Sequence, residues 1–136
     1  MSNQSVSTRF FETYGQRHDV EGCRPLFAAD AVIHSSTAPA SLDFEGYAQI
    51  GYAFLNGFAD LGVEILDQFA AGDRVATRVA WSGTHTGELN GIPPTGRTFC
   101  SEAIVIDRIV NGQIQERWDV SNMLGMMQQL GVMPAA

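Results

Sequence analysis

The sequence predicts an α+β domain in which helices come first and a mainly antiparallel sheet follows. Apolar residues recur at helical spacing in the first part of the chain, as at Val6, Phe10 and Tyr14. From Leu61 onward the apolar period changes to two, which is the repeat of a strand with one buried face. Asn111-Gly112 then separates two alternating segments and is a strong hairpin signal. Helices followed by hairpin-connected strands are typical of this fold class.

Three helical segments are expected before the main strands. The Val6 stripe predicts a first helix that ends near Gly15, and a short second helix is expected over 20–28. A brief strand at 31–34 and a proline-containing loop follow, after which Asp43 can cap the start of a third helix. The apolar stripe of that helix consists of Tyr47, Ile50, Phe54 and Phe58.

The strands and the last helix occupy the rest of the chain. The expected strands are 61–69, 75–82, 99–108 and 114–120, with a glycine-rich connection at 84–96 and a final helix at 123–130. A twisted sheet of this size cannot be covered flat by three helices, so it curls around them and leaves a pocket at its open end. We expect the function of the protein to lie in that pocket.

Composition excludes several classes of function. A length of 136 residues indicates a single domain over 1–136. All eight basic residues are arginines, so a lysine Schiff base, a lysine-bound pyridoxal phosphate and a phosphate-binding P-loop are excluded. A net charge of −7 disfavours nucleic acid as a partner, because counterion release requires a basic face.

The sequence also bears on location and metal binding. The N-terminal segment has no signal-peptide pattern, and no apolar stretch is long enough for a membrane span, so a cytoplasmic location without membrane contact is expected. Cys23 and Cys100 are far apart and are expected to be reduced. No spacing of histidines and cysteines predicts a metal site.

Acid–base chemistry in an apolar pocket remains, and Asp119 is the first candidate. Arg117, Asp119 and Ser121 share one face of the last strand. A desolvated carboxylate binds a proton more readily, which suits a general base. The alternative is a structural carboxylate paired with an arginine such as Arg117 or Arg78, and spacing alone leaves both interpretations open.

Other residues are candidates for ligand binding. His34 ends the first strand and could point into the pocket mouth, or be merely exposed there. His85 could donate to a carbonyl group, or only fix the loop that follows it. Tyr14 carries a hydroxyl group at the end of an apolar stripe. Apolar candidates for the pocket wall are Phe54, Trp118 and Met127; Trp118 and Trp81 could instead lie on a sheet face buried in a dimer.

Three segments of the chain resemble one protein family. Residues 83–97 (GTHTGELNGIPPTGR) are similar to a stretch of the SnoaL-like polyketide cyclases. Residues 116–131 (ERWDVSNMLGMMQQLG) resemble the C-terminal motif of these enzymes, and residues 27–34 (FAADAVIH) resemble the start of their first strand. Order and spacing agree from about Phe10 to Gly131.

The resemblance implies a fold and an activity. The fold is the nuclear transport factor 2-like cone, a curved mainly antiparallel sheet wrapped around three N-terminal helices with a short C-terminal helix, commonly dimeric through the outer sheet face. Characterised members close a ring of an aromatic polyketide by intramolecular aldol condensation, without a cofactor. The aspartate of their "HWD" segment is the general acid/base, and Asp119 matches it. The expected activity is therefore that of a cofactor-free cyclase or isomerase of a hydrophobic carbonyl compound. The expected partners are that small molecule and a second copy of the chain.

This sequence also departs from the family pattern. Arg117 stands where the characterised cyclases have histidine, Asn122 replaces a second acid, and the strand at 101–106 is mostly apolar. Two other functions therefore remain as alternatives. Arg117 and Asp119 could activate water in an epoxide hydrolase, or the domain could be a non-catalytic dimeric module that binds a small molecule.

Overall fold

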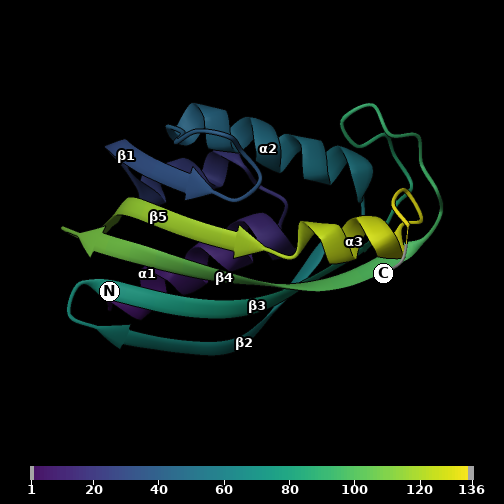
Figure 1. Cartoon of the computed structure of the whole chain (residues 1–136). Coiled ribbons are helices and arrows are strands. Elements are labelled where there is room, and N and C mark those ends of the chain that lie inside the picture. The colour runs from purple at the N-terminus through teal and green to yellow at the C-terminus, as the bar shows by residue number, and fades with distance from the viewer. Residues whose placement is uncertain (1, 135–136) are drawn as a thin grey trace.

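A computed structural model describes residues 2–134 of the chain, and its elements follow the predicted order (Figure 1). The α-helices are α1 (Asn3–Phe10), α2 (Phe44–Gly57) and α3 (Met123–Gln129). A π-helical turn, η1 (Phe11–Gln16), continues α1, and a 3₁₀ helix, η2 (Glu21–Leu26), follows it. The strands are β1 (Phe27–Ser35), β2 (Gly62–Ala71), β3 (Arg74–Thr84), β4 (Thr98–Val110) and β5 (Gln113–Ser121).

The strands form one curved sheet in the order β1-β5-β4-β3-β2. Only the β1–β5 pair is parallel among the strand pairs of residues 2–134, so the sheet is mainly antiparallel as predicted. Helix α2 lies over the β1 edge, and α3 continues from the end of β5 (Figure 1). The α+β cone expected from the sequence is therefore confirmed.

The core lies between the concave face of the sheet and the helices. Val6, Phe10 and Phe11 from the first helical segment are buried against Val75 and Val79 of β3 and their neighbours. Alternation along β3 places these valines on the inner face while Arg74 and Arg78 stay outside. The period-two pattern in the sequence thus marks which face of the sheet is covered.

Two boundaries near the N-terminus differ from the sequence prediction. The expected helix over 20–28 is only the 3₁₀ helix Glu21–Leu26, because Pro25 has no N–H group to continue an α-helix. The brief strand at 31–34 is longer than predicted and begins at Phe27, where β1 pairs with Ile114. The sequence also predicts that this segment buries Cys23, Leu26 and Phe27, and all three are buried.

The hairpin between β4 and β5 has the predicted geometry. Asn111 and Gly112 both adopt positive φ angles, 51° and 76°, as a type I′ turn requires. Asp43 also acts as predicted, because its side chain accepts a hydrogen bond from the Gly46 N–H at the start of α2. Within residues 2–134 no helix is long and apolar enough to cross a membrane.

The Gly112 turn gives a test of the fold. Gly112→Ala should lower the free energy of unfolding by about 1 kcal/mol or more, because an alanine at positive φ is strained. Gly62→Ala is the matched control, since a Cβ atom there would meet Ser82 Oγ at an ordinary 3.6 Å. Urea unfolding measures both variants, and equal losses of stability would contradict the assignment.

Candidate active site

A cavity of about 110 Å³ lies between the concave sheet face and the helices. Aromatic and apolar side chains make up most of its wall. They include Phe10, Phe11, Phe44, Phe54, Trp81, Phe99, Val105 and Met126. Hydroxyl groups of Tyr14, Ser35, Tyr47 and Ser121 and one carboxylate, Asp119, supply polar atoms. An apolar pocket with a few convergent polar groups is the usual form of a small-molecule site.

Asp119 is placed in this cavity by the register of two parallel strands. It lies on β5 directly opposite Ser35, the last residue of β1, and is 8% exposed. The Ser35 hydroxyl donates to Asp119 Oδ1 at 2.7 Å, and the Tyr47 hydroxyl donates to Oδ2 at 2.8 Å. Each oxygen therefore keeps a lone pair, and Asp119 is the only charged residue among the lining residues described.

The two arginines considered as partners of Asp119 are engaged elsewhere. Arg117 donates from Nε and Nη2 to the two carboxylate oxygens of Asp107 at 2.7 and 2.9 Å. Arg78 lies on the outer sheet face, where it pairs with Glu102. The alternative in which Asp119 is a structural partner of Arg117 or Arg78 is therefore wrong.

Tyr47 reaches Asp119 because of the helical spacing in α2. The Asp43 cap fixes the first turn, and Tyr47 then begins the apolar stripe that faces the cavity with Ile50 and Phe54. Burial raises the pKa of Tyr47 above its ordinary value, although Arg117 opposes this. The phenol is consequently a hydrogen-bond donor throughout the physiological pH range.

Tyr14 and Cys23 complete the titratable groups of the cavity wall. The Tyr14 hydroxyl donates to the Gly51 carbonyl oxygen at 2.8 Å, and burial raises the pKa of Tyr14. Glycine at position 51 permits this approach, because a Cβ atom there would lie 3.1 Å from the tyrosine ring. Burial also raises the pKa of the Cys23 thiol to about 12, so Cys23 is not a thiolate nucleophile at neutral pH.

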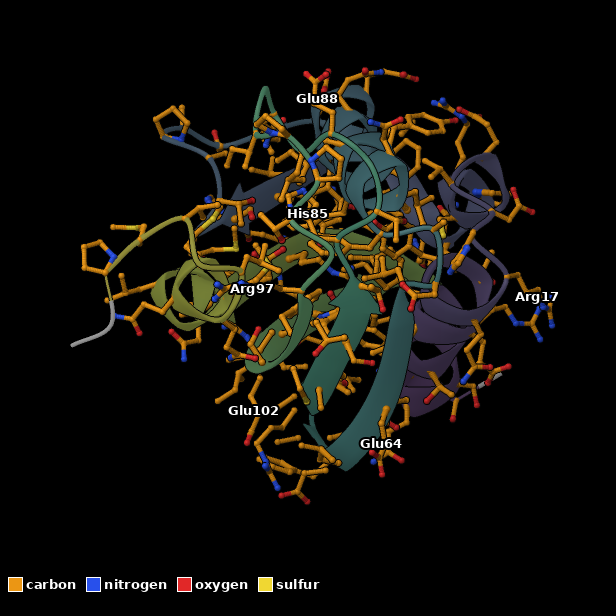
Figure 2. All side chains as sticks on the ribbon, turned by 90° about the vertical axis from the view of Figure 1, so that its right-hand side faces the viewer. Arg17, Glu64, His85, Glu88, Arg97 and Glu102 are labelled. Atoms are coloured by element: carbon orange, nitrogen blue, oxygen red, sulfur yellow. The ribbon has the colours of Figure 1, made fainter. Side chains whose placement is uncertain are left out.

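His85 lies at the base of the loop between β3 and β4 (Figure 2). It is not among the residues that line the cavity. It is fully buried, and its Nδ1 accepts from the Thr95 N–H at 3.3 Å. The loop is docked on the end of α2, where the N–H groups of Thr86 and Gly87 both donate to the Gly57 carbonyl oxygen at 3.1 Å. The hydrogen bond to Thr95 confirms that His85 holds the loop. Because His85 does not line the cavity, it could affect a ligand only by positioning this loop.

His34 and Trp118 lie outside the cavity. They are direct partners in the parallel β1–β5 register, and their rings stack at 5.5 Å on the outer face of the sheet. His34 Nε2 contacts Glu116 Oε2 at 2.7 Å. Because side chains alternate along a strand, the neighbours Ser35 and Asp119 point inward and these two residues point outward.

Of the two remaining candidates for the pocket wall, Phe54 and Met127, only Phe54 lines the cavity. Phe54 lines the cavity and its mouth, whereas Met127 packs beside the core and the cavity side of α3 is formed by Met123 and Met126. Sequence reasoning missed Ser35 and Tyr47, and it favoured a sheet face buried in a dimer for Trp81. Trp81 shares the inner face of β3 with Val79, so the alternation in the sequence already carried the signal that it faces inward.

The mouth of the cavity lies between α2, the loop after β1 and the tip of the loop after β3. Its polar residues are Ser36, Thr37, Gln49 and Asn90, beside Ile50, Ala53, Phe54 and Met123. Asn90 lines this opening at the loop tip, where Asn90 and Gly91 have positive φ angles of 49° and 84°. None of these lining residues is charged. Residues 2–134 contain no group of three or more His, Cys, Asp or Glu side chains that could hold a metal ion.

Comparison with known proteins now identifies the family. The sequence model described as SnoaL-like polyketide cyclase matches residues 5–130. The chain belongs to this family. Aklanonic acid methyl ester cyclase DnrD from Streptomyces peucetius is 43% identical over 60 residues, which cover 44% of this chain and 41% of DnrD. Nogalonic acid methyl ester cyclase from Streptomyces nogalater is 43% identical over 49 residues, covering 36% of this chain and 37% of that enzyme.

Solved structures agree with the family over nearly the whole chain. IdmH from Streptomyces antibioticus, assigned provisionally as a polyketide cyclase, is 32% identical with a TM-score of 0.86, over 96% of this chain and 99% of IdmH. AclR from Streptomyces galilaeus, assigned provisionally as a hydroxylase, is 28% identical with a TM-score of 0.89, over 98% of this chain and 83% of AclR. The curated cyclases, by contrast, are matched over only about two fifths of their length.

The buried position of His85 predicts a local effect of its removal. His85→Ala should speed hydrogen exchange of the Leu89 and Ile92 amides, which bond to each other's carbonyl groups in the loop, and should lower the melting temperature. His34→Ala is the matched control, because His34 is on the outer sheet face. Unchanged loop exchange in His85→Ala would contradict the anchoring role.

Proposed function

We propose that the protein catalyses an intramolecular aldol cyclisation of a neutral, hydrophobic polyketide ester, with Asp119 as general acid and base. The observation that carries this proposal is the geometry of Asp119, which lies in an apolar cavity, free of any arginine partner and held by two hydroxyl donors. Family membership supports it, as do the names of the related ester cyclases.

The reaction requires one base and good positioning. A carbon atom between two carbonyl groups loses its proton to a modest base, because the anion is delocalised into the substrate itself. Asp119 takes this proton, and the carbanion forms a C–C bond to an internal carbonyl carbon. The carbonyl π electrons move to its oxygen, and protonated Asp119 returns the proton to that alkoxide. The product is an isomer of the substrate, so no cofactor is consumed.

The size and charge of the cavity support a substrate that is partly enclosed and uncharged. An apolar protein cavity of about 150 Å³ holds a molecule of the size of benzene. A cavity of about 110 Å³ is smaller than that, so it can enclose only part of a ring of the substrate, while the rest occupies the mouth beside Gln49 and Asn90. A free carboxylate would meet no cationic side chain among the described lining residues and would be repelled by Asp119, which favours the ester over the acid.

The two alternatives have less support. An epoxide hydrolase would need a second carboxylate in the pocket, and Asp119 is the only one among its described lining residues. Arg117, the other residue considered for that reaction, is occupied by Asp107. A pocket filled by side chains, or an Asp119 paired with an arginine, would favour a non-catalytic binding module. Asp119 instead lines a cavity and has only hydroxyl groups as side-chain partners.

Substitution of Asp119 tests the proposal. Asp119→Asn should lower turnover of aklanonic acid methyl ester or nogalonic acid methyl ester by about 100-fold or more, because it removes the base while nearly keeping its shape. Product formation is followed by chromatography, and thermal unfolding checks that the variant is folded. The corresponding free acids should be turned over at least about 10-fold less efficiently.

Asp67→Asn is the matched control, because Asp67 is an exposed carboxylate on β2. It should retain the turnover of the wild-type protein. Full activity of Asp119→Asn would overturn the general-base role. Saturable binding of both esters by the wild-type protein without any conversion would favour the non-catalytic module.

We also propose that the protein is a homodimer through the outer face of the sheet. Ile104 and Val120 are register partners on that face and are 51% and 66% exposed. Beside them lie the partners Ile106 and Trp118. Charged pairs of both signs, Arg78–Glu102 and Arg108–Glu116, flank this apolar strip and would be self-complementary across a two-fold axis.

A charged residue in the apolar strip should prevent association. Val120→Glu should convert a dimer into a monomer, because two unpaired carboxylates would be buried near the axis. Light scattering after size-exclusion chromatography measures the mass. Tyr52→Glu is the matched control, since Tyr52 is an exposed apolar residue of α2. A monomeric wild-type protein would overturn the proposal.

A further inference from the structure

A chain of polar side chains runs through the core behind Asp119. The Ser7 hydroxyl of α1 donates to Asp107 Oδ2 at 2.8 Å, and Arg117 donates to both oxygens of Asp107. The remaining nitrogen of the guanidinium, Nη1, lies 3.5 Å from the Tyr47 hydroxyl oxygen. Since Tyr47 donates to Asp119, the chain links four elements to the candidate base.

The burial of charged side chains in this polar network is unusual. Arg117 and Asp107 are both 0% exposed, although charged residues are rarely buried to this extent. The guanidinium also stacks on the Phe10 ring at 3.8 Å from its centroid. Apolar side chains of similar volume often stabilise a core as well as a buried ion pair does. Any role of the guanidinium beyond packing would be exerted through Nη1, the nitrogen that faces Tyr47.

We propose that Arg117, held by Asp107, is the positioning residue of the site: it orients Tyr47 toward Asp119 and makes the phenol a stronger hydrogen-bond donor. The fork–fork contact with Asp107 fixes the guanidinium plane. The positive end of the Arg117–Asp107 pair then faces the phenol oxygen and polarises its O–H bond toward Asp119. This rests on the proposed function only in naming Asp119 as the base.

The consequence is stronger hydrogen bonding to the Asp119 carboxylate in an apolar cavity. Burial alone would favour the protonated acid, which cannot act as a base. The donors Tyr47 and Ser35 stabilise the carboxylate, and Arg117 strengthens one of them. The other titratable groups of the wall, Tyr14 and Cys23, have raised pKa values and carry no charge at neutral pH. The Arg117–Asp107 pair is thus the nearby charge that can act on Asp119 through Tyr47.

Carboxyl ¹³C NMR of Asp119 tests this inference without a substrate. The variants are Arg117→Met, Arg117→Lys, Tyr47→Phe and the double variant Arg117→Met/Tyr47→Phe, and Asp119→Asn identifies the signal. Arg117→Met and Tyr47→Phe should each move the pH midpoint of the Asp119 signal upward by about 0.5–1 unit, because each weakens support for the anion. The double variant should shift by less than the sum, because Arg117 acts through Tyr47. Arg117→Lys should restore part of the wild-type midpoint.

Arg78→Met is the matched control, since it removes an arginine from the outer sheet face and should leave the midpoint unchanged. A wild-type midpoint in folded Arg117→Met, or shifts that add fully, would overturn the proposal and leave Arg117 a structural residue. If Arg117→Met does not fold, Arg117→Lys and its combination with Tyr47→Phe complete the same cycle. Absence of ester turnover would overturn the proposed function but not this inference, because the NMR midpoint requires no turnover.

Discussion

The need to bury a charged guanidinium constrains the whole inner face of this protein. Arg117 points into the concave side of the sheet, where water is excluded, so all of its donors need partners within the core. Asp107 on β4 supplies two, and Ser7 of α1 and Tyr47 of α2 are drawn into the same network. Removing one partner from a buried pair typically costs about 3–5 kcal/mol, so this network fixes how both helices sit on the sheet.

The cavity follows from the same arrangement. Tyr47 is held at the Arg117 end of α2, while Tyr14 contacts the backbone of Gly51 one turn later. The two tyrosine side chains therefore lie between α2 and the rest of the core. The cavity between α2 and the sheet is lined mainly by aromatic and apolar side chains. A carboxylate placed there at the end of β5 is desolvated on most sides but satisfied by two hydroxyl groups. The polar contacts that hold the helices on the sheet therefore also hold the Asp119 carboxylate.

The structure gives a role to each of two residues that depart from the family pattern, Arg117 and Asn122. Arg117 replaces the histidine expected before the tryptophan and aspartate of the motif, and it has its own counter-ion one strand away. Asn122 replaces a second acid and caps α3 by accepting from the Gly125 N–H at 3.0 Å. Neither Arg117 nor Asn122 hydrogen-bonds to the Asp119 side chain, whose partners are Ser35 and Tyr47. The family reaction class remains compatible with the site.

The sequence by itself determined the fold class, the hairpin turn at Asn111-Gly112, the cap at Asp43 and which residues share a strand face with Asp119. These features follow from periodicity and local backbone chemistry, which act between residues near one another in the chain. Only the tertiary structure decided that Ser35 and Tyr47 bind Asp119, that Asp107 takes Arg117, and that His34 and Trp118 lie outside. Those outcomes depend on the parallel pairing of β1 with β5 and on the height of α2 above the sheet. Such contacts join residues up to about a hundred positions apart, and no local pattern specifies which of several buried polar groups will meet.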